Sequence, residues 1–319
     1  MATAVFLITC PDRPGLVAAV ANFVAAHGGN ILHADQHTDT ATGVFFQRVE
    51  FDLDGFPLPR DQIAGAFAPI AADLGMTARL AFSDDVPRVA ILASREPHCL
   101  TDLLARFAAG ELPADLAMVV SNHPDHRATA EFYGVPYHHL PVTPETKPAQ
   151  EATLRALLDE HGIDLVVLAR YMQILSDDFV AHYPSRIINI HHSFLPAFIG
   201  ARPYHQAHAR GVKVIGVTAH YATAELDEGP IIDQDVVRIS HRDAVEDLIR
   251  KGRDLEKVVL ARAIRAHLTS CALGRNLTDR PTLIAVDERS SRRHPAGIDR
   301  PPRLDRPSPP SSTGLDHDP

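Results

Sequence analysis

The chain has 319 residues, 45% of them hydrophobic, and a formal net charge of −9. This length suits two domains of ordinary size, and the apolar fraction is enough for a globular core. The acidic balance, without a cluster of Lys and Arg before residue 286, argues against a nucleic-acid partner, because duplex binding depends on neutralised phosphates.

No stretch approaches the roughly 20 apolar residues of a membrane span, and the N-terminus has no signal-peptide pattern. The three cysteines, Cys10, Cys99 and Cys271, are widely separated, which is typical of reduced thiols. We therefore expect a cytoplasmic protein with no membrane partner.

Residues 1–84 read as a small βαββαβ domain. "TAVFLITC" predicts a strand, and "DRPGLVAAVANFVAAHGGN" predicts a helix capped by Asp12, with Pro14 in its first turn and Gly28–Gly29 at its end. "ILHADQHT" and "VFFQRVEFDL" alternate as strands do, "RDQIAGAFAPIAADLG" predicts a second helix, and "TARLAFS" predicts a closing strand.

The segment "DRPGLVAAVANFVAAHGGNI" resembles an ACT domain, a ferredoxin-like module. The resemblance implies amino-acid binding or oligomerisation, with a homodimer or homotetramer as the expected assembly; a packing module without a ligand remains the alternative. It places a regulatory site at residues of the first turn and of the segment after the first helix: Asp12, Arg13, Pro14, Gly15 and Asn30.

"SDDVP" reads as a linker, and a different pattern covers residues 88–285. The apolar runs "RVAILAS", "LAMVVSN", "DLVVLAR" and "IINIHH" alternate with helical stretches, which predicts a Rossmann-like, mostly parallel sheet with helices on both faces. Residues 287–319 are rich in Pro, Ser, Arg and Asp, and we expect them to be disordered. The turn after the first of these strands, "ASREPHC", has no glycine, which argues against a dinucleotide cofactor.

Polar side chains gather where one of these strands ends. Asn189 and His191 are two residues apart on an extended chain and should point to one face, with His192 pointing to the other. After the strand "KVIGVTAHY", the loop "ATAELDEGP" presents Asp227 between other carboxylates. An amide, an imidazole and a carboxylate together suit attack on a carbonyl carbon through a tetrahedral intermediate.

Each residue also has a structural interpretation, as a turn former or a satisfied histidine. A metal is a further alternative, because His205, His208 and His220 are close in sequence, but neither Cys nor the H-E-x-x-H pattern supports it, so we expect no metal.

Three segments, "VVLARYMQILS", "INIHHSFLPAFIGARPYHQA" and "GVTAHYATAELDEGPII", resemble the catalytic core of the folate-dependent formyl-transfer and formyl-hydrolysis family. The resemblance implies catalytic roles for Asn189, His191 and Asp227, with His220 and His192 supporting them. It places the folate pterin against two short segments: Met172, Gln173, Ile174 and Leu175, and Ala222, Thr223, Ala224, Glu225 and Leu226.

The resemblance implies a hydrolase that cleaves 10-formyltetrahydrofolate, a linear amide, to formate and tetrahydrofolate, serving purine synthesis and the one-carbon pool. Asp227 with His191 would deprotonate a water, and no cofactor is implied besides the folate substrate. The hydrolytic branch is favoured because "ASREPHC" lacks the glycines that hold an acceptor's phosphate, and because "HHSFLP" and "GARPYHQA" are similar to that branch. Formyl transfer to an amine and a non-enzymatic ACT-domain regulator are the alternatives.

One position departs from the family. Where the family often has a basic residue for the glutamate tail of folate, this chain has Gln173. The resemblance leaves Lys147 and Arg170 as candidate replacements, and ordinary surface charge is the alternative for each.

Overall fold

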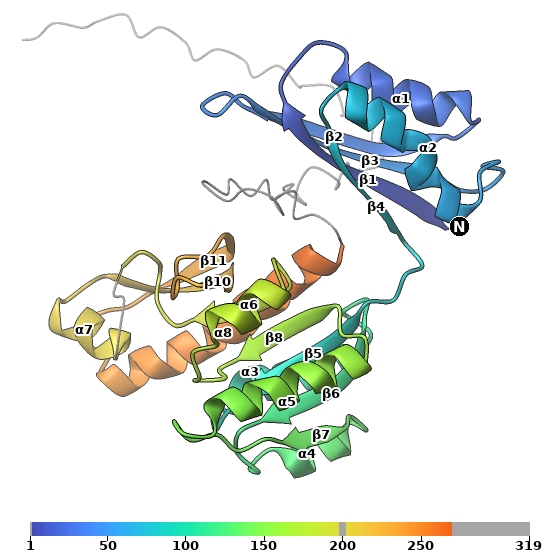
Figure 1. Ribbon diagram of the computed structural model, residues 1–319. Helices are drawn as coiled ribbons and strands as arrows, with labels where there is room; N and C mark the ends of the chain where they lie inside the picture. The colour runs from blue at the N-terminus through green and yellow to red at the C-terminus, as the bar shows by residue number, and fades with distance from the viewer. Residues whose placement is uncertain (1, 198–201, 270–319) are drawn as a thin grey trace, which may run out of the picture. The chain divides into compact units, whose positions relative to one another are not determined.

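The computed structural model describes residues 2–197 and 202–269 (Figure 1). Within these residues the chain forms a four-stranded sheet in its N-terminal part and a seven-stranded sheet in the remainder. No described helix is long and apolar enough to cross a membrane.

The N-terminal domain has the predicted βαββαβ order. Its elements are β1 Thr3–Pro11, α1 Leu16–Ala26, β2 Ile31–Asp39, β3 Val44–Asp52, α2 Arg60–Asp73 and β4 Thr77–Phe82. The strands pair antiparallel in the order β2-β3-β1-β4, and both helices lie on one face of the sheet (Figure 1). The core between them is built on the phenylalanines of β1, α1, β3 and α2.

The start of the first helix was wrong in the sequence prediction. Helix α1 begins at Leu16, after Gly15 with φ of 96°, and no side-chain hydrogen bond caps it within the described residues. Asp12 and Pro14 therefore belong to an exposed loop before the helix. The end is as expected, because Gly28 takes the left-handed conformation (φ 70°) just beyond it.

The first nine helices and strands of the second domain run from β5 to β9. They are β5 Arg88–Ala93, α3 His98–Ala108, β6 Asp115–Ser121, α4 Arg127–Phe132, β7 Tyr137–His139, α5 Lys147–Glu160, β8 Leu165–Ala169, α6 Asp177–His182 and β9 Ile187–His191. The last four are α7 Pro203–Ala209, β10 Val214–Tyr221, β11 Ile231–Arg238 and α8 Val245–Leu268.

The strand order is β11-β10-β9-β8-β5-β6-β7, with parallel pairing from β9 through β7 and antiparallel pairing of β10 with both neighbours. Helices α3 and α8 cover one face and α5 and α6 the other, each over an apolar core. The strands β5, β6, β8 and β9 read as continuous apolar runs because both of their faces are buried. The mostly parallel sheet with helices on both faces confirms the predicted fold class. The predicted disordered tail, residues 287–319, lies outside the described residues.

We expect Phe6→Ala to lower the free energy of unfolding of the N-terminal domain by about 3–5 kcal/mol. Phe6 is 1% exposed, and its ring lies 4.6 Å from that of Phe67, 5.6 Å from that of Phe51 and 5.9 Å from that of Phe23. Urea denaturation would measure the loss. The matched control is Phe132→Ala, whose side chain is 82% exposed and which should change stability by less than about 0.5 kcal/mol. Equal losses in the two variants would contradict the predicted core.

Candidate active site

Strand β9 places the first two candidate catalytic side chains. Ile188 and Ile190 pack into the core under α3 and α8, so the alternation of the strand turns Asn189 and His191 to the opposite face, beside α5 and α6. The same alternation directs His192 toward the side of α8. The two neighbouring histidines therefore enter different environments.

Strand β10 adds His220, which pairs in register with Asn189. Asn189 Nδ2 lies 3.1 Å from His220 Nε2, and His220 Nδ1 lies 2.9 Å from the carbonyl oxygen of Tyr221. The carbonyl can only accept, so His220 Nδ1 carries a proton, and in the neutral ring Nε2 accepts from the amide of Asn189. Among the residues that the structure describes, the second N–H of that amide has no partner.

The loop between β10 and β11 has to fold back to deliver Asp227. Because β10 runs antiparallel to β9, it ends beside Ile188, toward the start of β9 and away from His191. The loop is closed at its base by a 2.8 Å hydrogen bond from Tyr221 N to the Pro230 carbonyl. A Cβ at Gly229 would lie 1.8 Å from the Tyr221 carbonyl oxygen, so only glycine fits this closure. Asp227 itself takes a left-handed conformation with φ of 59°.

This return brings the carboxylate and the imidazole together. Asp227 Oδ2 lies 3.2 Å from His191 Nδ1, and Asp227 Oδ1 lies 3.5 Å from His220 Nε2. The hydrogen bond from His191 holds the pKa of Asp227 well below its ordinary value despite partial burial, and the nearby ring of His220 adds to this effect. The carboxylate is thus ionised, and it orients His191 with the proton on Nδ1.

The other ring nitrogen of His191, Nε2, has no hydrogen-bond partner among the described residues. His191 is 6% exposed, and this atom is buried. With Nδ1 donating to Asp227, Nε2 carries a lone pair that can take up a proton. A buried polar atom without a partner is costly in a finished structure and is expected where a substrate completes the site.

A cleft opens beside these residues, between β8 and the returning loop. Most residues predicted to contact the pterin line it: Gln173, Ile174, Leu175, Ala222, Thr223, Ala224 and Leu226, together with Leu168, Val180, Asn189, His220 and Asp227. Met172 and Glu225 are not part of this lining. Ile174 and Leu226 are about three-fifths exposed at 61% and 59%, which leaves apolar surface uncovered at the mouth of the cleft.

His192, which the sequence predicted to support the catalytic residues, points to the other side of the strand, with its ring centroid 5.1 Å from that of His191. Burial, with the charges of Arg170 and His191, lowers its pKa to about 4, so the ring is neutral near neutral pH. His205 and His208 lie on α7, on exposed positions. Among the described residues, the group of metal-capable donors found within 4.8 Å of one another is His98, Cys99 and Glu256, which contains neither of them.

Sequence reasoning missed Glu256, which is 1% exposed on α8 and accepts hydrogen bonds from two aromatic side chains. A signal for its burial was present. Glu256 continues the stripe of Gly252, Val259, Leu260 and Ala263 on the covered side of the helix. Its partners come from α3 and α7, far away in sequence, and no local pattern identifies them.

The fold and site define the class of protein. Residues 87–264 match the family model of the formyl transferase domain, and residues 4–66 match that of the ACT domain. The chain thus joins a catalytic domain of the formyl transferase type to an ACT domain.

The relatives narrow the class. A formyltetrahydrofolate deformylase from Synechocystis sp. is 58% identical over 266 residues, which is 83% of this chain and 93% of that protein. The crystal structure of a formyltetrahydrofolate deformylase from Pseudomonas syringae matches with a TM-score of 0.83 and 52% identity, over 85% of this chain and 91% of that one. The chain belongs to the formyltetrahydrofolate deformylase family.

A solved structure named as a transferase is similar over a smaller part. Glycinamide ribonucleotide transformylase 1 from Symbiobacterium toebii matches with a TM-score of 0.56 and 36% identity, over 60% of this chain and 92% of that chain. Proteins named as deformylases and as transformylases therefore share this fold. The fold alone does not determine whether water or an amine receives the formyl group, and the side chains of the site do.

We expect Asp227→Asn to destabilise the catalytic domain by about 1.5–3 kcal/mol near pH 7, the range for hydrogen bonds to a charged group. The folded pKa of Asp227 lies below the unfolded value of about 3.9, so its stabilising effect is present above that pH and is lost as the pH falls. Urea denaturation of both proteins from about pH 7 down to about pH 3 should show the difference shrinking.

The matched control is Asp178→Asn. Asp178 pairs with Arg155 at 2.7 Å on the surface, where such pairs contribute less than about 1 kcal/mol. A difference between wild type and Asp227→Asn that stays constant over this pH range would contradict the ionised pair.

Proposed function

We propose that this protein is a hydrolase that cleaves 10-formyltetrahydrofolate to formate and tetrahydrofolate. The carrying observation is His191, held by Asp227 at 3.2 Å on Nδ1 and with Nε2 buried and unpartnered among the described residues, in a chain of the deformylase family. The products supply formate for purine synthesis and return folate to the one-carbon pool.

The residues divide the reaction between them. His191 Nε2 takes a proton from a water, whose oxygen attacks the formyl carbon. The free N–H of Asn189 donates to the oxygen that becomes an oxyanion in the tetrahedral intermediate. The imidazolium then gives its proton to N10, the C–N10 bond breaks, and tetrahydrofolate leaves together with formic acid, which loses its remaining acidic proton to water and becomes formate. Ionised Asp227 stabilises the imidazolium in between.

The lowered pKa of Asp227 changes one step of the mechanism that the sequence suggested. A carboxylate whose pKa lies well below its usual range is a weak base, so His191 rather than Asp227 accepts the water's proton. This mechanism uses the folate as substrate and routes no step through a cofactor or a metal.

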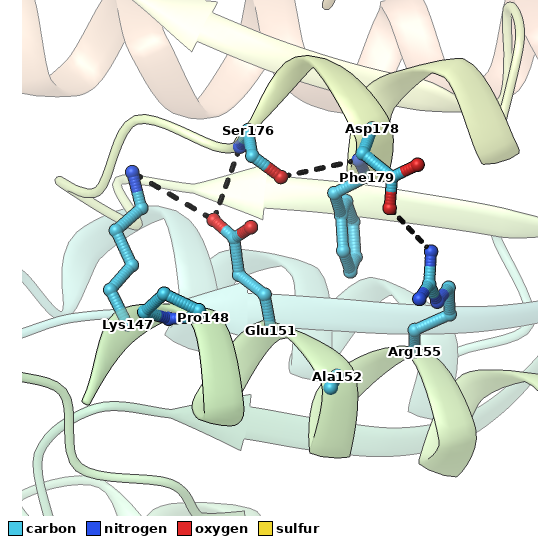
Figure 2. Close-up of a pocket in the computed structure, with 8 residues that line it drawn as sticks. All are labelled: Lys147, Pro148, Glu151, Ala152, Arg155, Ser176, Asp178 and Phe179. Atoms are coloured by element: carbon cyan, nitrogen blue, oxygen red, sulfur yellow. Dashed lines mark hydrogen bonds and ion pairs between the residues drawn. The ribbon is translucent and has the colours of Figure 1, made fainter.

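Of the two candidate cations, Lys147 rather than Arg170 is placed to bind the glutamate tail of the folate. The guanidinium of Arg170 is mostly buried, and its Nε lies 3.5 Å from Glu256. Lys147 instead borders a cavity of about 340 Å³ between α5 and the start of α6, where its Nζ is 3.8 Å from Glu151 (Figure 2). Ser176 and Phe179 of this cavity directly continue the segment that lines the pterin cleft, so a tail leaving that cleft reaches Lys147.

The ACT domain makes amino-acid regulation and a homodimer or homotetramer part of the proposal. Asp12, Arg13, Pro14 and Gly15 form the exposed loop before α1, and Asn30 is exposed just before β2. Loop and segment offer polar groups that an amino acid requires. The edge strand β2 carries mostly exposed or half-buried side chains, and pairing of such edges would extend the sheet between subunits.

Transfer to an amine and a purely regulatory role are the competing functions. The assembled Asn189, His191 and Asp227 argue against a regulator without catalysis, since such a protein has no need of a buried, unpartnered imidazole nitrogen. The loop after β5, which carries no glycine, argues against an acceptor phosphate.

Purified protein should release formate and tetrahydrofolate in equal amounts from 10-formyltetrahydrofolate, with no amine added. His191→Ala and Asn189→Ala should each lower kcat by about 10²–10⁴, since each removes a proton-transfer or oxyanion group. His205→Ala, an exposed histidine of α7, serves as the matched control and should retain full activity. Formate release that requires an amine would refute hydrolysis, and full activity of His191→Ala would refute the assigned site.

Lys147→Ala should raise KM for 10-formyltetrahydrofolate about tenfold, which corresponds to about 1.4 kcal/mol, and leave kcat nearly unchanged. The effect should vanish with a substrate that lacks the glutamate tail. Lys213→Ala is the control, because Lys213 precedes β10 at the end of the strand away from His220. A KM increase that persists without the tail would contradict the assignment.

A further inference from the structure

The segment between β8 and α6 forms one wall of the pterin cleft without belonging to a strand or a helix. Gln173, Ile174 and Leu175 line the cleft, and Met172 beside them is 60% exposed. Among the described residues, no backbone–backbone hydrogen bond is found for residues 172–175. Apart from Leu175, which packs against the core under α5 and α6, the position of this segment therefore depends on contacts at its two ends.

The backbone of the segment is also strained. Met172 takes a φ of 26°, in the left-handed region that residues with a Cβ rarely adopt, and Arg170 shortly before it has a φ of 61°. Such conformations are unfavourable and persist only where the surrounding structure imposes them. The shape of the cleft therefore requires groups that hold this segment against the strain.

Helix α5 holds both ends of the segment with two neighbouring buried polar residues, Gln150 and Glu151, each 8% exposed. Gln150 Nε2 donates a 3.0 Å hydrogen bond to the hydroxyl of Tyr171, just before the segment. Glu151 Oε1 accepts a 3.1 Å hydrogen bond from Ser176 N, just after it. Buried polar side chains are unfavourable unless they make such bonds. We call these four residues the α5 clamp.

The clamp also reaches α6 through Ser176. Figure 2 shows the carboxylate of Glu151 next to Ser176 and Lys147, and the hydroxyl of Ser176 pointing to α6. Ser176 Oγ accepts a 3.2 Å hydrogen bond from Phe179 N and so caps α6, on which the next residue, Val180, lines the cleft. The clamp thus fixes two neighbouring parts of the chain that form this side of the cleft.

We infer that Gln150 and Glu151 are positioning residues for the folate, which hold residues 172–175 in the strained conformation that binds the pterin. This inference rests on the function proposed above, in which the cleft takes up the folate. Without either hydrogen bond the segment would relax, and binding would have to restore the bound conformation at a cost in affinity. Substrate and transition state would lose this affinity alike, because the segment binds the pterin and not the formyl group.

The test measures KM and kcat separately in Gln150→Met, Glu151→Met and Tyr171→Phe, each of which removes one hydrogen-bonding group. We expect each variant to raise KM for 10-formyltetrahydrofolate about tenfold and to keep kcat within about twofold of the wild type. Glu151→Gln keeps an acceptor for Ser176 N and should restore nearly the wild-type KM. A merely structural role would lower the active fraction, and with it kcat, at an unchanged KM.

A substrate without the glutamate tail separates the clamp from tail binding. Glu151 Oε1 also lies 3.8 Å from Lys147 Nζ, so Glu151→Met could act through that cation. The clamp variants should raise KM for the substrate without the tail as much as for the complete substrate, whereas Lys147→Ala should not. An effect of Glu151→Met that disappears without the tail would overturn its role in the clamp.

Tyr183→Phe is the matched control. Tyr183 is 2% exposed, and its hydroxyl donates a 2.8 Å hydrogen bond to Asp159, which joins the end of α6 to the last turn of α5, away from the segment. This variant removes one buried hydroxyl, as Tyr171→Phe does, and should leave KM at the wild-type value. If a Met variant does not fold, Tyr171→Phe still decides, because it removes a single hydroxyl.

The outcomes also separate the clamp from the reaction. Formate from the wild type, with the wild-type KM in every folded clamp variant, would leave hydrolysis standing and overturn the clamp. No formate from the wild type without an amine would instead refute the hydrolysis. Equilibrium dialysis of tetrahydrofolate with the same variants would then still decide, because a raised Kd would support the clamp and an unchanged Kd would overturn it.

Discussion

The site depends on the antiparallel pairing of β9 with β10. In a purely parallel sheet, the strand ends that carry function lie at one edge. Here β10 runs the other way, so His220 comes to lie opposite Asn189 while the chain leaves the strand at the wrong end for His191. A loop that folds back over the sheet face is the geometric consequence, and the carboxylate of Asp227 reaches His191 only through it. The left-handed backbone at Asp227 and the close approach at Gly229 are local costs of that return.

Two ionised carboxylates then flank the sheet near one strand end, and each is stabilised by an imidazole. Asp227 lines the cleft and lies within 3.5 Å of His191 and His220, and Glu256 lies on the side of α8 with His98. Buried charge is tolerated in both places because hydrogen bonds replace the lost water. The two groups differ in whether all of their buried polar atoms have hydrogen-bond partners. His191 Nε2 has no hydrogen-bond partner among the described residues, whereas both carboxylate oxygens of Glu256 accept hydrogen bonds.

The sequence predicted correctly those features of the fold whose evidence lies within a single strand or helix. The apolar runs of β5, β6, β8 and β9 announced a sheet buried on both faces, and the i, i+2 spacing placed Asn189 and His191 on one side of a strand. The sequence did not predict the features that depend on packing between different elements. The short elements β7 and α6 have too few residues for a period, and β11 has half-buried, polar-rich sequence, as an edge strand does. Asp12 failed as a helix cap because the left-handed Gly15 starts α1 later. His98, one of the partners of Glu256, lies more than 150 residues away from it in the chain, and no local sequence pattern predicts such a contact.

The alternation of β9 has a consequence for the path of the proton. His191 and His192 are adjacent in sequence, and in solution both would titrate near neutral pH. The strand turns His191 toward Asp227 and His192 toward α8, where burial, with the charges of Arg170 and His191, lowers the pKa of His192 to about 4. His191 rather than His192 therefore lies against Asp227, on the same side of the strand as Asn189. In the reaction proposed above, His191 both takes the water's proton and protonates N10, because Asp227 stays ionised and Asn189 cannot ionise. Hydrolysis with a single imidazole needs no separate acid, and the proton moves only the short distance between the attacking oxygen and the leaving nitrogen.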